Sequence, residues 1–450
     1  MRRWLKRIFF VLAVFVPILA AFYFYAQWQG DRELRGVIAE LDAQGEPWRW
    51  DDLLAARPKG PEDEKVRALI NQVVFVARRG WKSKNIQRSI PPNAFFSPEV
   101  GAVLAKDFKA LEQTIAEART TLNMPSGRYV VQHGAKVLQP PGDNVLDVLH
   151  VSELLQLAAM WHARQGDLDL AIEDCQATQH ASRILQDEPE LLGQLVRVAM
   201  QTIAIETLEH VLAQGIAPSQ ELRQLQEALE QSGIERAMIE GVRGERAGQH
   251  RIYTAMADGE ITLHDLAGKV GGPSSIRESA LELYGRWNLK HAHTWALRQT
   301  TAILNAMELP EPQRSAELRN IQNDESKAPR HAMTSHICAH VIEAQRVTAR
   351  TRCAILGLAL ECYRQANERW PQSLDDLCPK YVAVVLEDPC SGEPLRYRFT
   401  KDGVVVYSVG LDGNLRGAYR DDAKLNQRNA AYEFRLWNVP QRRQMAVAKP

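Results

Sequence analysis

The feature that most constrains this chain is a run of nineteen uncharged and mostly apolar residues, Ile8–Ala26, near its N-terminus. A helix of about twenty such residues crosses the hydrocarbon core of a bilayer. Tyr23, Tyr25 and Trp28 lie at the far end of the run, where interfacial aromatic residues are expected. No other apolar run in the sequence approaches this length. The sequence therefore predicts one N-terminal transmembrane helix.

The residues around this run predict its orientation. Four basic residues and no acid precede it: Arg2, Arg3, Lys6 and Arg7. By the positive-inside rule, the N-terminus lies in the cytoplasm and the bulk of the chain lies outside it. This predicts a single-pass protein of the bacterial inner (cytoplasmic) membrane. A cleaved signal peptide is the alternative, although Phe24 stands where a small residue would precede cleavage at Ala26.

Composition limits the classes of partner. Hydrophobic residues make up 45% of the 450 residues and charged residues 24%, as in folded globular proteins. The chain has 55 basic and 55 acidic residues, so it lacks the basic field that attracts nucleic acid. We expect it to bind the membrane through one N-terminal helix and to bind another protein, but not nucleic acid.

Apolar residues recur at helical spacing along most of the chain. The expected fold class is mainly α, with an N-terminal transmembrane helix, an irregular α-helical array and a small C-terminal α+β unit containing an antiparallel hairpin. The expected regions are the basic segment and anchor (1–30), an N-terminal helical region (31–142), the helical array (143–329) and a long helix followed by the α+β unit (330–450).

A helical hairpin is predicted in the array. Gly166 and Asp167 interrupt a helical pattern, and Ala159 and Ala171 place small residues where the two helices would cross. This arrangement resembles one half of a tetratricopeptide unit, although only one such unit is found. We expect Gly166 to end the first helix, Asp167 to cap the second, and Arg164 to be solvated. The side chains expected to be buried are Leu155, Ala158, Cys175 and Ile184.

The C-terminal region carries a strand pattern. Leu395–Phe399 alternates apolar and basic residues, which predicts that Leu395, Tyr397 and Phe399 share one face. Asp402-Gly403 predicts a turn, and Val404–Val409 would then form the returning strand. Tyr432–Trp437 is a candidate third strand.

Three segments of this region carry a family resemblance. A helix ends in a Trp370-Pro371 turn, Asp388–Tyr397 reads DPCSGEPLRY, and Tyr407–Gly413 reads YSVGLDG. In this order they resemble the C-terminal part of type II secretion major pseudopilins, over about 70 residues. The resemblance implies a helix followed by a small sheet. The order of segments along the whole chain is also similar to that of large membrane-anchored bacterial proteins.

The same resemblance implies a calcium site in the loop after the last motif. Calcium takes six to eight oxygen ligands. The oxygen-bearing residues there are Asp412, Asn414, Asp421 and Asp422. Arg416 and Arg420 lie between them and would repel a cation, so a solvated loop is the alternative. Calcium is the one cofactor considered.

Two histidines have the spacing of transition-metal ligands. His336 and His340 are four residues apart, which places them on one face of a helix, where they could chelate zinc or copper. His331 lies off that face, and no Glu lies between the pair as in H-E-x-x-H. Solvated imidazoles at a helix start are the alternative.

Two cysteines are candidates for a disulfide. Eleven residues separate Cys378 from Cys390, and in an oxidising compartment they could join the turn region to the strand. Cys175, Cys338, Cys353 and Cys362 are expected to be small buried hydrophobes.

The sequence lacks the common catalytic motifs, including G-x-S-x-G, C-x-x-C and G-x-G-x-x-G. It therefore favours a non-enzymatic envelope protein: a protein-binding scaffold, or an accessory of a secretion or pilus-like assembly. The alternative is an envelope hydrolase or metal-dependent enzyme that uses the region His331–His340.

Overall fold

The computed structural model describes residues 2–57, 62–81, 91–124, 129, 137, 144–266, 276–324, 336–410 and 432–445. Within these ranges, residues 2–12, 19, 62–63, 78–79 and 276–284 are described by their backbone alone. The helices and strands in chain order are α1 (Arg2–Ala43), α2 (Trp50–Ala56), α3 (Glu62–Arg79), β1 (Ala94–Phe95), α4 (Pro98–Arg119), η2 (Thr120–Asn123), η3 (Val145–Val148), α5 (Leu149–Gln165), α6 (Leu168–Ala181), η4 (Ser182–Leu185), α7 (Leu191–Leu212), α8 (Ser219–Glu230), α9 (Ile234–Ala257), α10 (Leu263–Leu266), α11 (Ile276–Met307), α12 (Gln313–Asp324), α13 (Ile337–Asn367), η6 (Leu374–Leu377), β2 (Arg396–Thr400), β3 (Gly403–Tyr407), β4 (Glu433–Trp437), η9 (Val439–Gln441) and β5 (Gln444–Met445).

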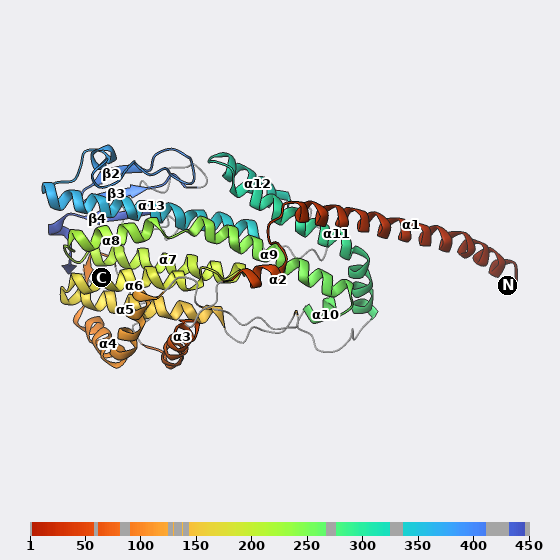
Figure 1. Ribbon diagram of the computed structural model, residues 1–450, viewed down its shortest axis with the longest axis horizontal. Coiled ribbons are helices and arrows are strands. Elements are labelled where there is room, and N and C mark those ends of the chain that lie inside the picture. Colours follow the sequence, from red (N-terminus) through yellow and green to blue (C-terminus); the bar gives the residue numbers. More distant parts are fainter. Residues whose placement is uncertain are drawn as a thin grey trace.

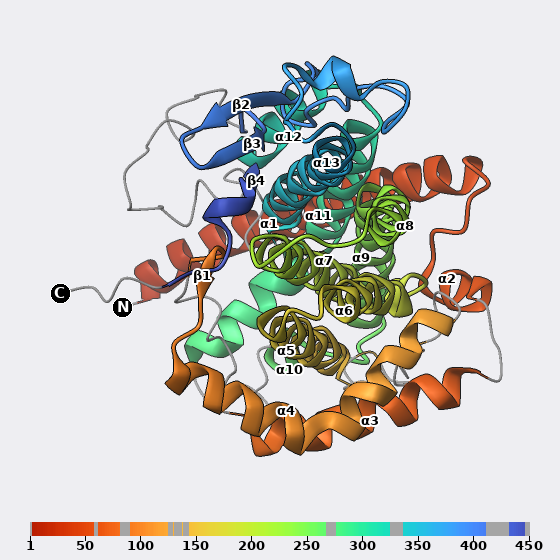
Figure 2. The same cartoon turned by 90° about the vertical axis from the view of Figure 1, so that its left-hand side faces the viewer.

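The protein is mainly helical, with a small antiparallel sheet near its C-terminal end. Figure 1 shows an elongated body of helices from which the N-terminal half of α1 projects alone. The strands lie at the end of the body far from this projection. Seen along the long axis, α3 and α4 wrap α5, α13 lies between α8 and the sheet, and β4 also contacts α7 (Figure 2).

The predicted hairpin is formed by α5 and α6. Gly166 ends α5 in the left-handed conformation, with a φ of 93°, and Ala159 and Ala171 are fully buried between the helices. The four side chains expected inside are buried as well: Leu155, Ala158, Cys175 and Ile184. Two expectations were wrong. Asp167 makes no capping hydrogen bond, and Arg164 is half-buried because it donates to the Phe96 carbonyl at 2.9 Å.

The predicted strands form one sheet in the order β2-β3-β4, and both pairs are antiparallel. The turn between β2 and β3 is Lys401-Asp402, one residue earlier than expected, because Thr400 pairs with Gly403. Gly403 instead allows β3 to approach β4 closely, because a Cβ at this position would overlap the backbone of Leu436 on β4. The rings of Tyr397 and Phe399 touch on one face, as predicted, with their centroids 5.5 Å apart.

Helix α13 joins the sheet to the helical array. Its apolar face shares one core with α5–α8, and that core includes Leu358 of α13, Ile172 of α6, Leu208 of α7 and Phe434 of β4. The expected boundary at residue 330 therefore does not separate two hydrophobic cores. A short parallel pair, Ala94 with Gln444 and Phe95 with Met445, also connects the C-terminal segment to the N-terminal region. No local pattern in the sequence predicted this pair.

The predicted transmembrane run lies in the helix α1, whose backbone is continuous from Arg2 to Ala43. The side chains of residues 8–12 and 19, which belong to the run, are outside the described part of the structure. Among the residues that are described, no helix is both long and apolar enough to cross a membrane.

Candidate functional site

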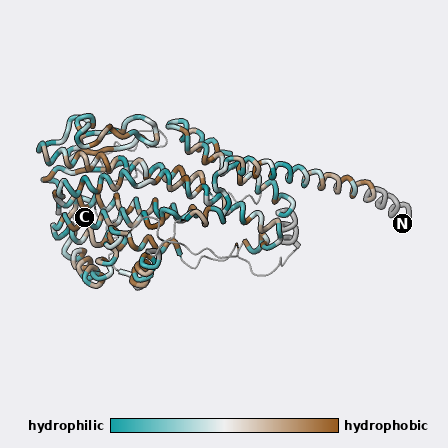
Figure 3. The backbone as a smooth tube through the Cα atoms, in the orientation of Figure 1, coloured by the Kyte–Doolittle hydropathy of each residue, from teal (hydrophilic) through white to brown (hydrophobic). Residues whose placement is uncertain are grey.

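The most unusual surface of the molecule is the projecting part of α1. Apart from Tyr23, which is 38% exposed, its described large apolar side chains are exposed by 43% for Val14 up to 69% for Phe24. The others in this group are Phe15, Val16, Ile18, Phe22, Tyr25 and Trp28. Figure 3 shows the same stretch as a hydrophobic segment outside the body. Contiguous exposed apolar surface on this scale is typical of a binding or membrane site.

The remainder of α1 packs against α11. The rings of Tyr23 and Trp287 meet edge to face with centroids 5.0 Å apart, and the Gln27 side chain donates to the Trp287 carbonyl at 3.0 Å. Two turns farther along, Lys290 Nζ lies 2.7 Å from Asp31 Oδ1. The junction changes, within a few residues, from exposed apolar side chains to a packed helix pair.

The end of α1 is buried in a small apolar cluster. Val37 and Leu41, four residues apart on one face of the helix, pack with Trp48 and Leu297. The Trp48 indole also donates to Asp42 at 2.9 Å. These contacts attach α1 to the body at two levels, beside Trp287 and beside Leu297.

A histidine pair lies next to this cluster. His250 Nδ1 and His293 Nε2 are 2.9 Å apart, and the His293 ring stacks on Tyr253. Burial lowers the pKa of His293 to about 3, and the neighbouring His250 adds to the effect. Burial, with the charge of Arg49, lowers the pKa of His250 to about 4. Both rings are therefore neutral at pH 7, and they act as polar packing groups.

The predicted transition-metal site is not assembled in the described residues. His336 is exposed at the N-cap of α13, and His340 follows one turn later with its N–H bonded to the His336 carbonyl at 3.0 Å. Nowhere in the part of the chain that the structure describes do three His, Cys, Asp or Glu side chains gather as metal ligands would. His331 is outside that part.

The predicted calcium loop lies outside the described residues as a whole. All four of its candidate ligands fall within 411–431: Asp412, Asn414, Asp421 and Asp422. Calcium binding there stays a prediction.

The predicted disulfide between Cys378 and Cys390 is not formed, since both are free thiols. The two cysteines belong to different surroundings. Cys378 follows η6 beyond the C-terminal end of α13, whereas Cys390 sits beside Asp388. Burial, with the charge of Asp388, raises the pKa of Cys390 to about 12, so this thiol is not a nucleophile at neutral pH.

The motifs DPCSGEPLRY and YSVGLDG meet at Asp388, which is only 1% exposed. Its carboxylate accepts hydrogen bonds from Ser408 Oγ at 2.7 Å, from the Cys390 N–H at 2.9 Å and from the Val409 N–H at 2.8 Å. Sequence analysis identified both motifs but not this contact. Asp388 thereby fixes the end of β3 just before the segment 411–431.

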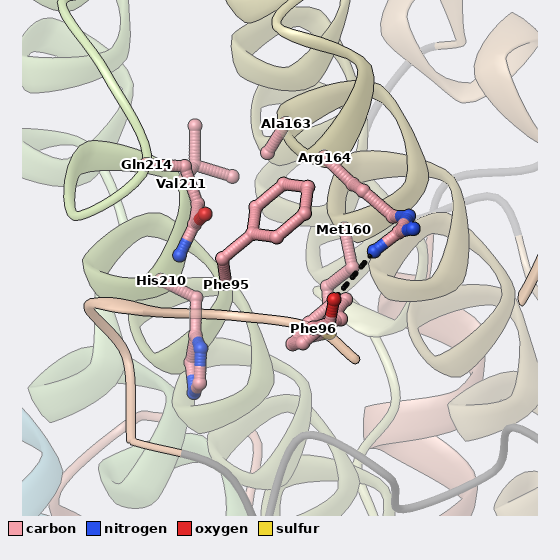
Figure 4. Close-up of a pocket in the computed structure, with 8 residues that line it drawn as sticks. All are labelled: Phe95, Phe96, Met160, Ala163, Arg164, His210, Val211 and Gln214. Atoms are coloured by element: carbon pink, nitrogen blue, oxygen red, sulfur yellow. Dashed lines mark hydrogen bonds between the residues drawn. The ribbon is translucent and has the colours of Figure 1, made fainter. Parts of the chain in front are cut away.

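A small pocket lies at the end of the body remote from the projection (Figure 4). The Phe95 ring sits between two guanidinium groups, 4.8 Å from that of Arg164 and 5.0 Å from that of Arg443. Gln214 donates to the carbonyls of Pro92 and Ala94. These contacts hold β1 against α5 and α7, so the residues around the pocket connect parts of the fold. A two-residue strand has no periodicity that could have predicted it.

No protein-family model, no curated protein and no solved structure matches this chain. Its function must therefore be inferred from its own residues.

Proposed function

We propose that this protein is a non-enzymatic, single-pass protein of the bacterial inner membrane, with the N-terminus in the cytoplasm. Its helical body would be a protein-binding scaffold or an accessory of a secretion or pilus-like assembly. The observation that carries the proposal is the exposure of the described large apolar side chains on α1 between Val14 and Trp28.

The energetics favour a lipid environment for this stretch. Keeping apolar surface in water costs roughly 25 cal/mol for each Å². The body shields only the end of the stretch, where Tyr23 meets Trp287. The run is preceded by basic residues and has the length of a bilayer core, which fits a signal anchor.

Membrane fractionation tests the anchor. The full chain should sediment with membranes and resist extraction at high salt, whereas a variant without residues 2–26 should be soluble. A reporter that is active only outside the cytoplasm, fused after Pro450, should be active. Removal of residues 2–26 without loss of membrane association, or an inactive external reporter, would contradict the proposal.

The end of the body remote from the projection is the proposed partner-binding surface. Leu170, Ile216 and Val439 expose apolar side chains there, at 41%, 51% and 41%. The backbone beneath them is rigidly held, because Arg442 donates to the Gly215 carbonyl at 2.5 Å and the Arg443 N–H to the Ala213 carbonyl at 3.2 Å. A fixed apolar surface loses little conformational freedom on binding.

Site-specific photocrosslinking tests this surface. A crosslinker at Ile216 should give a discrete adduct in intact cells. The matched control is Leu192, which is 46% exposed at the opposite end of α7. Equal adducts at both positions, or none at Ile216, would remove the support for a partner at this end.

A further inference from the structure

We infer that the body itself rests on the lipid surface through Trp287, and that α1 holds it there at a fixed height. The inference rests on the membrane anchor proposed above. The occupant of this surface is the interfacial layer of the bilayer, where headgroups meet acyl chains.

The side chains along α1 change in the order that a membrane interface requires. Exposed aliphatic and Phe residues continue as far as Phe24. Tyr23, Tyr25 and Trp28 then bring amphipathic rings, and charged residues begin at Asp31. Tyr and Trp are enriched at the boundary between hydrocarbon and water. The boundary therefore lies at residues 23–28.

Trp287 places the body at the same level. Its ring contacts that of Tyr23, and its backbone carbonyl accepts a hydrogen bond from Gln27. The Trp287 side chain is still 37% exposed although a neighbouring helix covers part of it. An exposed Trp in contact with the interfacial Tyr23 continues the aromatic belt from α1 onto α11.

The packing of α1 prevents the body from swinging away from this level. Helix α1 is unbroken from Arg2 to Ala43, and Gly30 lets it approach α11 closely, since a Cβ there would lie 3.3 Å from Lys290 Cβ. The ion pair of Asp31 with Lys290 and the cluster at Leu297 hold the next turns. The part of the anchor that follows Pro17 thus continues into the body as one packed helix. The sheet lies at the end of the body far from the projecting helix (Figure 1).

Depth-dependent quenching tests the inference on the full chain in liposomes of phosphatidylethanolamine and phosphatidylglycerol. An environment-sensitive fluorophore is attached to a cysteine at one position at a time, in a Cys378→Ala background. The positions are Trp287→Cys, its neighbour Arg286→Cys with Trp287 intact, Ile18→Cys inside the anchor and Val384→Cys, which is 67% exposed on the body.

We expect lipids that carry a quencher near the headgroup to quench positions 286 and 287 several-fold more strongly than position 384. Lipids with a deep quencher should quench position 18. If the labels at positions 286 and 287 are not quenched while the label at position 18 is, the inference is overturned and the anchor is retained. An unquenched position 18 would instead refute the anchor. A label at 287 shielded from both water and quencher would assign Trp287 to a protein partner, which also overturns the inference.

Discussion

Two long helices of this protein each carry an apolar segment, and the surroundings of the two segments differ. In α13, the ten residues Cys353–Cys362 are buried by α7, α8 and the sheet. In α1, the described large apolar side chains between Val14 and Tyr25 are exposed. An apolar run requires apolar surroundings, but the run alone does not determine whether protein or lipid provides them.

The side chains within α13 explain why protein can surround it. Gly357 leaves room for the Phe434 ring, which a Cβ at this position would overlap. Glu361 places a carboxylate inside the apolar run, and it pairs with Arg442 at 2.7 Å and with Arg364 at 2.6 Å. Burial alone would raise the pKa of Glu361, but these guanidinium groups lower it. Helix α1 has neither acid nor glycine within its run.

The largest contrast should come from one aspartate placed in each run. Leu358→Asp buries an unpaired charge in the shared core, which costs more than about 4 kcal/mol and should leave little folded protein. Ile18→Asp should leave the thermal unfolding of the body unchanged, because Ile18 is 59% exposed. It should weaken membrane association, since an aspartate at the centre of a membrane helix costs about 3 kcal/mol. Both variants are compared by soluble yield, thermal unfolding and membrane fractionation. A destabilised Ile18→Asp body would break the comparison.

The second largest contrast is the effect of acidification on the free energy of unfolding. We expect an effect from the region beside the packed end of α1 but not from the ion pair in α13. The neutral His293 lies beside the packed end of α1, and its folded-state pKa of about 3 is below the ordinary value of 6.5. When the pH is lowered from 7 to 5, His293 gains a proton in the unfolded chain but not in the folded chain. The free energy of unfolding therefore decreases as the pH is lowered. The loss is about 2 kcal/mol from this group, at 1.36 kcal/mol for each pKa unit.

Chemical denaturation at pH 7 and pH 5 measures this effect. His293→Gln should reduce the loss of stability on acidification, whereas His336→Gln, at an exposed position, should leave it unchanged. The ion pair of Glu361 should not contribute, because its lowered pKa keeps the carboxylate charged at pH 5. An unchanged pH dependence in His293→Gln would show that this imidazole is not a buried neutral group.

The smallest expected contrast comes from adding one methyl group to a glycine in each of the two helices. Gly357→Ala should destabilise the protein by about 1 kcal/mol, because overpacking against Phe434 outweighs the helix propensity of alanine. Gly36→Ala on α1 should stabilise it by about 0.5 kcal/mol, because a Cβ there meets nothing within 4 Å. Opposite shifts of the melting temperature are expected, and shifts of the same sign would contradict the packing described for α13.

Much of the secondary structure could be predicted from local patterns. The helix α3 buries Val66, Ile70 and Val73 at helical spacing. The strands β2–β4 lie at the three segments that the sequence predicted as strands. The helix α12 was missed, because its sequence is strongly polar and buries only three residues: Ser315, Leu318 and Ile321. Transition-metal binding by His336 and His340 stays a prediction, since spacing along one helix cannot show whether a third ligand arrives from elsewhere, and none does so among the described residues.

The sequence by itself determined the helical class, the Gly166 corner, the hairpin and the apolar run at the N-terminus, because each depends on residues close together in the chain. Only the tertiary structure decided which apolar surfaces are covered by other parts of the same chain. It joined Asp388 to Ser408, Phe95 to Arg443 and Tyr23 to Trp287, over separations that local periodicity does not encode. It also placed α13 inside the core while leaving the N-terminal half of α1 outside. Burial depends on the shape of what lies opposite, and that shape is set by the whole fold.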